Sequence, residues 1–229
     1  MNIIAIIPAR SGSKRLPRKN IKVLDSLPLI SWTINVAKEV KGLSQIIVST
    51  DNQEIADIAK ESGALVPWLR PKDISKDDST IVEVLIHCLS WLDANDNRPD
   101  AIMVLQPTSP FRKAETIERA IDSFKEGGGK SVIGVSDSGH CHPHWSFTLD
   151  GNDIIPSYPE GINQRSQILP KTFFVNGYVY IVKTDTIYND QTLFTKKCIP
   201  IEVPQEESID IDTEWDWNLA EFQLLKRIK

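Results

Sequence analysis

Cysteine is scarce in this chain of 229 residues, and the three that occur, Cys88, Cys141 and Cys198, lie far apart without a Cys-x-x-Cys pair. An odd number at such spacing predicts neither a disulfide framework nor a zinc ribbon, and favours a reducing compartment. Long apolar runs are also lacking, because the longest, such as residues 3–8, are too short to span a bilayer. No basic segment leads into a long apolar stretch at the amino terminus, as a secretory signal would require. We therefore expect a cytoplasmic protein without a membrane span.

An excess of positive charge is lacking too, since 26 Lys and Arg stand against 31 Asp and Glu, for a net charge of −5. Bulk nucleic-acid binding needs a basic surface, so no nucleic-acid partner is expected. The charges are unevenly spread between one basic N-terminal loop and one acidic C-terminal stretch. The loop holds Arg10, Lys14, Arg15, Arg18 and Lys19, and the stretch holds Glu206, Glu207, Asp210, Asp212, Glu214 and Asp216.

Short β-rich runs alternate with helical patterns along most of the chain. The continuous apolar run at 3–7, ended by Pro8, predicts a strand buried on both faces. This β-α order predicts an α/β fold with a mostly parallel sheet and helices on both of its faces. Further strands are expected at 46–48, 101–105, 131–135 and 178–182, and helices at 29–40, 82–89, 116–124 and 215–228. A helix through Ile55, Ile58 and Ala59 is expected to be capped by Asp51 with Glu54.

Residues of about 137–173 interrupt this alternation. They contain four prolines, Pro143, Pro156, Pro159 and Pro170, and few long apolar runs. We expect an extended arm or small subdomain there, inserted into a single domain that spans residues 1–229.

Two motifs suggest other chemistry but stand in the wrong context. The triplet GKS at 129–131 resembles the end of a P-loop, yet the glycine required five residues before it is Phe124. The run HCHPH at 140–144 offers soft metal ligands, but ligands so close together in an extended chain rarely converge on one ion. Neither a P-loop nor a zinc site is expected.

The basic loop follows the first expected strand directly, where open α/β sheets place their ligand crevice. Small residues at 11–13 allow the backbone to approach a ligand and turn its N–H groups toward an anion. Arg10, Lys14 and Lys19 could neutralise a triphosphate. The alternative is a solvated basic loop. The position after the strand and the small residues among the charges favour the phosphate site.

Asp210 and Asp212 stand two residues apart, so on an extended segment both side chains project from one face. Two convergent carboxylates with phosphate oxygens form an all-oxygen site suited to Mg²⁺. The alternative is that Asp212 or Thr213 caps the last helix. Both roles are compatible, because capping and metal binding use different oxygens.

Four motifs occur in order along the chain: PARSGSKRLPRKN at 8–20, VSTD at 48–51, LQPTSPFR at 105–112 and SIDIDT at 208–213. Together they resemble the signature segments of the acylneuraminate cytidylyltransferase family, and the likeness extends from the first strand to the last helix. The resemblance implies a Rossmann-like nucleotide-diphospho-sugar-transferase fold, a homodimer, Mg²⁺ as cofactor and CTP as nucleotide donor. It also implies that the inserted arm serves dimerisation and reaches toward the partner's active site.

The resemblance assigns roles by position. Arg10 and Lys19 contact the phosphates and, with Asp210 and Asp212, carry catalysis; Ser13 and Lys14 line the loop; Asn20, Arg70 and Ser79 surround the ribose and cytosine; Gln106, Arg165, Gln167 and Tyr180 face the sugar; Asp210 and Asp212 hold the metal.

The implied reaction is attack by the anomeric 2-hydroxyl of a nine-carbon 2-keto acid sugar on the α-phosphate of CTP, which releases pyrophosphate. Gln106 and the residues after it resemble the sialate and legionaminate enzymes, and VPWLRP at 66–71 resembles the legionaminate group. We therefore expect N,N'-diacetyllegionaminate or N-acetylneuraminate as the acceptor, with the first favoured. The alternative is a non-catalytic nucleotide-binding sensor of the same fold. Such a sensor would be expected to lose Arg10, Lys19 or the carboxylate pair, and all four residues are present.

Overall fold

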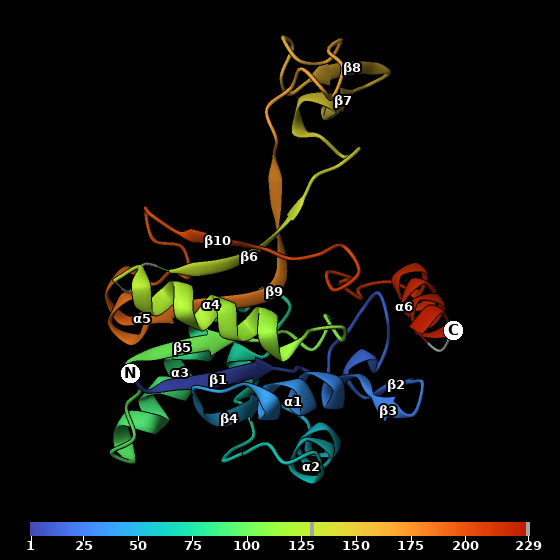
Figure 1. Cartoon of the computed structure of the whole chain (residues 1–229). Coiled ribbons are helices and arrows are strands. Elements are labelled where there is room, and N and C mark those ends of the chain that lie inside the picture. Colours follow the sequence, from blue (N-terminus) through green and yellow to red (C-terminus); the bar gives the residue numbers. More distant parts are fainter. Residues whose placement is uncertain (129–130, 228–229) are drawn as a thin grey trace.

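The computed structural model describes residues 1–128 and 131–227, so Gly129 and Lys130 of the P-loop-like triplet lie outside it. A six-stranded sheet forms its centre, in the order β10-β6-β9-β5-β1-β4 (Figure 1). Neighbouring strands run parallel except at β9, which is antiparallel to both β5 and β6. The mostly parallel α/β sheet predicted from the sequence is confirmed. Its strands are β1 (Ile3–Pro8), β4 (Leu43–Ser49), β5 (Ala101–Val104), β6 (Val132–Asp137), β9 (Phe173–Lys183) and β10 (Ile199–Glu202).

Helices cover both faces of the sheet, because β1 is apolar on both of its sides. Ile3 and Ile7 pack with the buried residues of α1, α2 and α4, whereas Ile4 and Ile6 pack with those of α3 and α5. This arrangement is what a continuous apolar strand requires. The helices are α1 (Leu29–Glu39), α2 (Gln53–Glu61), α3 (Ile81–Ala94), α4 (Ala114–Glu126), α5 (Thr184–Asp190) and α6 (Glu214–Arg227). None of the helices in the described part of the chain is long and apolar enough to cross a membrane.

The predicted cap of α2 is wrong by one residue. Asn52 is the N-cap, and its side chain accepts a hydrogen bond from the amide of Ile55 at 3.1 Å. Asn and Asp cap helices about equally well. Asp51 instead accepts hydrogen bonds from the basic loop, which the sequence pattern could not reveal.

A third cluster of buried apolar residues joins distant parts of the chain next to the sheet. Leu16 of the basic loop and Leu24 of the β2–β3 hairpin (Val23–Leu24, Leu27–Pro28) pack against Ile211 and Trp217. Figure 1 shows α6 beside this hairpin. The cluster holds the acidic stretch against the basic loop.

Helix α6 is only partly anchored. Trp217 is buried, whereas Trp215 is 78% exposed. The helix packs through Trp217 and Ala220, and Trp215 lies on another side of it. The predicted end at Ile228 lies outside the described residues.

Between β6 and β9 the chain leaves the sheet as a long projection, which we call the arm and define as residues 138–172 (Figure 1). Its far end carries a two-stranded antiparallel hairpin of β7 (Phe147–Asp150) and β8 (Asp153–Pro156). Three 3-10 turns complete the elements: η1 (Lys19–Ile21), η2 (Lys72–Ile74) and, within the arm, η3 (Pro143–Trp145).

Candidate active site

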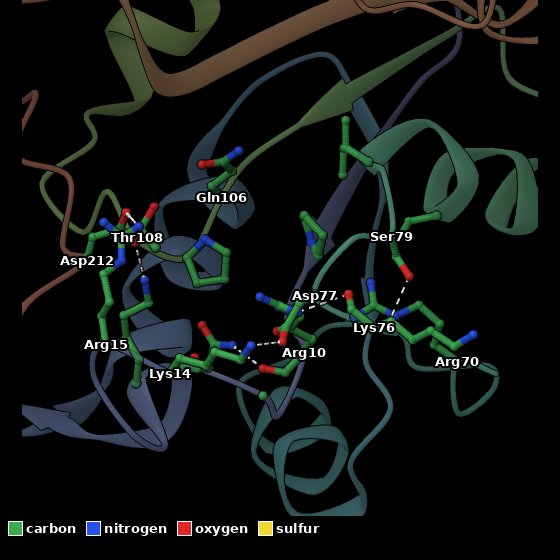
Figure 2. A pocket seen from close by; sticks show the side chains of 18 of the residues that line it. Arg10, Lys14, Arg15, Arg70, Lys76, Asp77, Ser79, Gln106, Thr108 and Asp212 are labelled. Carbon is green, nitrogen blue, oxygen red and sulfur yellow. Dashed lines mark hydrogen bonds and ion pairs between the residues drawn. The ribbon is translucent and has the colours of Figure 1, made fainter. Parts of the chain in front are cut away.

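A cavity of about 500 Å³ opens beyond the carboxyl ends of β1 and β5 (Figure 2). Three loops form its walls: the basic loop after β1, residues 70–81 before α3, and residues 106–108 after β5. Of the residues singled out from the sequence, it is lined by Arg10, Ser13, Lys14, Lys19, Asn20, Arg70, Ser79, Gln106 and Asp212. The predicted crevice and the observed cavity coincide.

The basic loop is fastened to the neighbouring strand before it enters the cavity. The backbone amide and hydroxyl of Ser11 both donate to the carboxylate of Asp51 at 2.8 Å. The amide of Ala9 donates to the carbonyl of Ser49, at the end of β4, at 2.9 Å. No atom lies within 4 Å of the position that a Cβ on Gly12 would take, so the loop keeps open space at this point.

Two cations of the loop meet one carboxylate on the opposite wall. Arg10 donates to Asp77 at 2.7 Å and to the carbonyl of Lys76 at 2.9 Å, and Lys14 forms an ion pair with Asp77. The hydrogen bond from Lys14, with that from Arg10, lowers the pKa of the Asp77 carboxyl. The sequence analysis missed Asp77, although the charged run at 76–78 just before α3 was a usable signal.

A second group of charges lies at the other side of the cavity (Figure 2). The Nζ of Lys19 donates to Oδ1 of Asp212 at 2.7 Å and to the carbonyl of Ile211 at 2.8 Å. Arg15 donates to Oδ2 of Asp212 at 2.5 Å. The side chain of Lys19 is only 11% exposed, whereas that of Arg15 is largely in solvent. Asp212 is therefore held by one buried and one exposed cation.

Thr213, not Asp212, caps helix α6. Its hydroxyl accepts from the amide of Asp216 at 3.3 Å and donates to the Asp216 carboxylate, which also accepts from the amides of Asp212 and Thr213. The side-chain oxygens of Asp212 are thus left for the cavity. Both interpretations of this segment therefore hold, because Thr213 caps the helix and Asp212 faces the cavity.

Asp210 lies on the same extended segment but does not line the cavity. The residue as a whole is exposed, but the protein around its carboxyl partly removes water and raises its pKa, and the negative charge of Asp212 raises it further. Two neighbouring carboxylates of this kind fit a hard cation. In residues 1–128 and 131–227, no cluster of three or more His, Cys, Asp or Glu is arranged to hold a metal ion. A Mg²⁺ site here would need oxygens from a substrate, as is usual for this ion. The histidines of the arm form no such cluster either.

Arg70 and Ser79, two of the residues assigned to the nucleoside, lie on the side of the cavity away from Asp212 (Figure 2). Arg70 is buried, donates from Nε to the hydroxyl of Ser75 at 3.1 Å, and has its pKa lowered by burial. Asn20, which also lines the cavity, donates from its side-chain amide to the carbonyl of Arg10 at 2.9 Å, and the Ser79 hydroxyl accepts from the backbone amide of Lys76 at 3.0 Å.

The four residues assigned to the sugar are not brought together within one chain. Gln106 lines the cavity, but Tyr180 belongs to the core cluster under α3 and α5, where burial raises its pKa. Arg165 and Gln167 are exposed on the arm, outside the cavity.

Comparison with known proteins identifies the family of the chain. Residues 4–147 match a protein-family model described as cytidylyltransferase. The chain is 40% identical over 224 residues to a CMP-N,N'-diacetyllegionaminic acid synthase of Legionella pneumophila, an alignment that covers 96% of this chain and 95% of that protein. It is 34% identical over 221 residues to an N-acylneuraminate cytidylyltransferase of Streptococcus agalactiae, covering 95% of this chain but 52% of that protein, of which it spans about half the length.

The fold is shared with more distant solved structures. A CMP:2-keto-3-deoxy-manno-octonic acid synthetase complexed with CTP superimposes with a TM-score of 0.73 at 16% identity, covering 99% of this chain and 100% of that one. A 4-diphosphocytidyl-2C-methyl-D-erythritol synthase of Anaerococcus prevotii gives a TM-score of 0.68 at 17% identity, covering 98% of each chain. At these identities the likeness concerns the fold alone. The match over residues 4–147, together with the two relatives aligned over nearly the whole chain, shows that this protein belongs to the cytidylyltransferase family.

Proposed function

We propose that the protein is a CMP-nonulosonate synthetase, which transfers CMP from CTP to a nine-carbon 2-keto acid sugar and releases pyrophosphate. One observation carries this proposal. The cavity at the strand ends is lined by cations of its basic loop, by Asp212 and by Gln106, in a chain 40% identical to a CMP-N,N'-diacetyllegionaminic acid synthase. N,N'-diacetyllegionaminate is the favoured acceptor because of that relative, and N-acetylneuraminate is the second.

The phosphate end of the nucleotide is assigned to the basic loop. Arg10 and Lys14 both reach the cavity and are held there by a single carboxylate, Asp77, so an arriving triphosphate could replace Asp77 as their partner. The Nζ of Lys19 is held in place by its hydrogen bond to the carbonyl of Ile211. Placed cations of this kind stabilise the charge that develops on a transferring phosphoryl group.

Asp210 and Asp212 are proposed to hold Mg²⁺. When bound, the ion neutralises phosphate oxygens and orients them for in-line displacement. In the protein, Lys19 and Arg15 each donate to one carboxylate oxygen of Asp212 and fix its direction, and the Thr213 cap leaves these oxygens unused by α6. The raised pKa of the Asp210 carboxyl suits a role in deprotonating the sugar hydroxyl.

We also propose that the protein is a homodimer of the cytoplasm in which the arm extends to the partner. A two-stranded hairpin is marginally stable alone, and exposed apolar side chains mark interaction surfaces. Leu149 and Ile168 of the arm are 71% and 72% exposed in the single chain, and Phe147, Ile154 and Ile155 are exposed beside them. An arm docked on the partner would bury these residues. It could also carry Arg165 and Gln167 to the partner's cavity, since they lie outside their own.

The test is pyrophosphate release from CTP with Mg²⁺ and a panel of nonulosonic acids. We expect release that depends on the acceptor, with the highest kcat/KM for N,N'-diacetyllegionaminate. The order of kcat/KM values names the sugar. ATP, GTP and UTP serve as controls for the nucleotide. If no acceptor in the panel gives pyrophosphate release while calorimetry still detects CTP binding, the nucleotide sensor is favoured instead.

A further inference from the structure

The pairing of strand β9 with β6 is interrupted near the candidate site. From Tyr180 to Val175 it advances by five residues, while its partner β6 advances by only two, from Ile133 to Val135. The additional residues form a bulge, which we define as residues 176–179. Within it Gly177 has a φ of +72°, a conformation that favours glycine. The side chain of Asn176 supports the bulge by accepting from the amide of Tyr178 at 3.1 Å.

One buried cation, Arg112, fastens this bulge to the loop after β5. Its guanidinium donates to the carbonyls of Tyr178 at 2.6 Å and Gly177 at 3.2 Å, and to the carbonyl of Ser109 at 2.6 Å. A fourth hydrogen bond goes to the hydroxyl of Thr33 at 3.0 Å. Arg112 is 5% exposed, and burial lowers its pKa to about 10, so it remains a cation at neutral pH. The bulge frees carbonyls from strand pairing, and Arg112 satisfies them.

Gln106 rests directly against the bulge. A Cβ added to Gly177 would lie 2.8 Å from Oε1 of Gln106 and 3.5 Å from its Cδ. The first distance is closer than a carbon and an oxygen can approach, so only glycine leaves room for the observed position of the amide. Gln106 lines the cavity on the side of Asp212 (Figure 2). The two segments that set its position, the bulge and the loop through Ser109, are both held by Arg112.

We propose that Gly177 and Arg112 are positioning residues that fix the Gln106 amide toward the acceptor sugar, a role that rests on the proposed CMP-nonulosonate synthetase function. Gly177 supplies the space, and Arg112 holds the two backbone segments on either side of the amide. The pair therefore acts on acceptor recognition and leaves the basic loop, which lies in another part of the cavity, unaffected. This separation distinguishes positioning from a general contribution to stability.

The first experiment compares Gly177→Ala with the matched variant Gly42→Ala. Gly42 also has a positive φ, +96°, but the nearest atom to its added Cβ is 3.8 Å away. Both variants strain the backbone, so both should lower the melting temperature. Only Gly177→Ala should raise the KM for the acceptor, by about tenfold, with the KM for CTP unchanged. An unchanged acceptor KM in Gly177→Ala, or an equal change in Gly42→Ala, would overturn the proposal.

A double-mutant cycle then tests whether Gly177 acts through Gln106. Gln106→Ala should weaken acceptor binding in the wild type but have little further effect when Gly177 is already alanine, since the amide has already been displaced. Arg112→Lys, which cannot make the same forked contacts, should show the same acceptor-selective change with a larger loss of stability. Additive effects in the cycle would contradict the mechanism.

One readout does not depend on catalysis. The side-chain amide signals of Gln106, assigned in NMR spectra by their absence from Gln106→Ala, should shift in Gly177→Ala and stay in place in Gly42→Ala. If the wild type releases no pyrophosphate with any acceptor, the proposed function and the acceptor role fall together. The amide signals would then still test whether Gly177 sets the position of the Gln106 side chain, and unshifted signals in Gly177→Ala would overturn that claim.

Discussion

The Nζ of Lys19 lies 2.7 Å from Oδ1 of Asp212, although the two residues are separated by 193 positions in the chain. The same Asp212 carries the candidate metal role. We predict that Asp212→Ala lowers kcat/KM by at least about 100-fold, or ~2.7 kcal/mol of transition-state stabilisation. The variant loses a metal carboxylate and leaves the buried Lys19 without its anionic partner. Steady-state pyrophosphate release at saturating CTP measures the effect.

Glu214→Ala is the matched control, because it removes the same charge two residues further along. Glu214 pairs with Lys22 at 3.0 Å in an exposed position, and exposed pairs contribute little. Its activity should stay within about twofold of the wild type. Near-normal turnover of Asp212→Ala at low Mg²⁺ would refute the metal assignment.

The sequence was sufficient to predict the fold and the position of the basic loop at the cavity. Apolar runs such as that of β1 reveal buried strands through their composition alone, and a basic loop after such a strand is a local pattern. The SIDIDT motif is equally local, so Asp210 and Asp212 could be named without coordinates.

What could not be predicted depends on contacts between distant segments. Asp51 looked like a helix cap because local spacing favours one, yet Ser11, 40 residues earlier, takes its carboxylate. The sequence did not reveal which side of α6 meets the protein: Trp217 is buried, whereas Trp215, two residues earlier, is 78% exposed. No repeating pattern of residue types in the sequence marks the bulge of β9. The hydrogen bonds of Arg112 that hold it join segments 65 residues apart.

We expect Asp77 to compete with the nucleotide for the cations of the basic loop, since it pairs with both Arg10 and Lys14. We predict that Asp77→Asn lowers the KM for CTP by roughly threefold at low ionic strength, because Arg10 and Lys14 no longer have to leave a carboxylate. The gain should fade as salt is added, since exposed charges are screened. Asp78→Asn, which changes the same charge in the adjacent position, is the control and should have a smaller effect.

The pH dependence of this effect follows from the ion pairs. The hydrogen bond from Lys14 lowers the pKa of Asp77, so the carboxylate stays ionised throughout the neutral range. The difference between Asp77→Asn and the wild type should therefore be the same at about pH 6 and about pH 8. A difference that disappears at the lower of these values would show that Asp77 is already protonated there, which contradicts a lowered pKa.

Asp210 is expected to destabilise the metal-free protein at neutral pH. Burial raises its pKa in the folded state, so the folded protein favours the protonated carboxyl. Stability is then lost as pH rises through the unfolded pKa of about 3.9 and beyond, and is recovered as pH falls. We predict that Asp210→Asn raises the melting temperature near pH 7.5 and not below about pH 4, while activity falls at least about tenfold.

Asp216→Asn provides a control of opposite sign. Burial opposes ionisation of Asp216, but hydrogen bonds from Thr213 and from the amide of Asp212 lower its pKa overall. Its carboxylate therefore stabilises the fold at neutral pH, and the variant should melt at a lower temperature than the wild type there. Scanning calorimetry across the pH range measures both variants. Equal shifts for the two would show that the environment of Asp210 has been misassigned.

If the arm forms the dimer interface as proposed, a substitution on its exposed surface should separate the subunits without unfolding them. Leu149→Glu should give monomers in sedimentation velocity, because Leu149 is exposed in the single chain and its replacement disturbs no core. Leu225→Glu, at a similarly exposed apolar position on α6, should leave the dimer intact. Monomers should still bind CTP but should lose acceptor-dependent pyrophosphate release.

A mixing experiment decides whether the arm serves its own cavity or that of the partner. Asp212→Ala disables a cavity, and Arg165→Ala disables an arm. If arms act across the dimer, each heterodimer of the two variants has one cavity with both residues intact. Random exchange makes half of the dimers heterodimers, so about a quarter of wild-type activity should return. If each arm serves its own chain, every heterodimer has two defective sites, and mixing restores nothing.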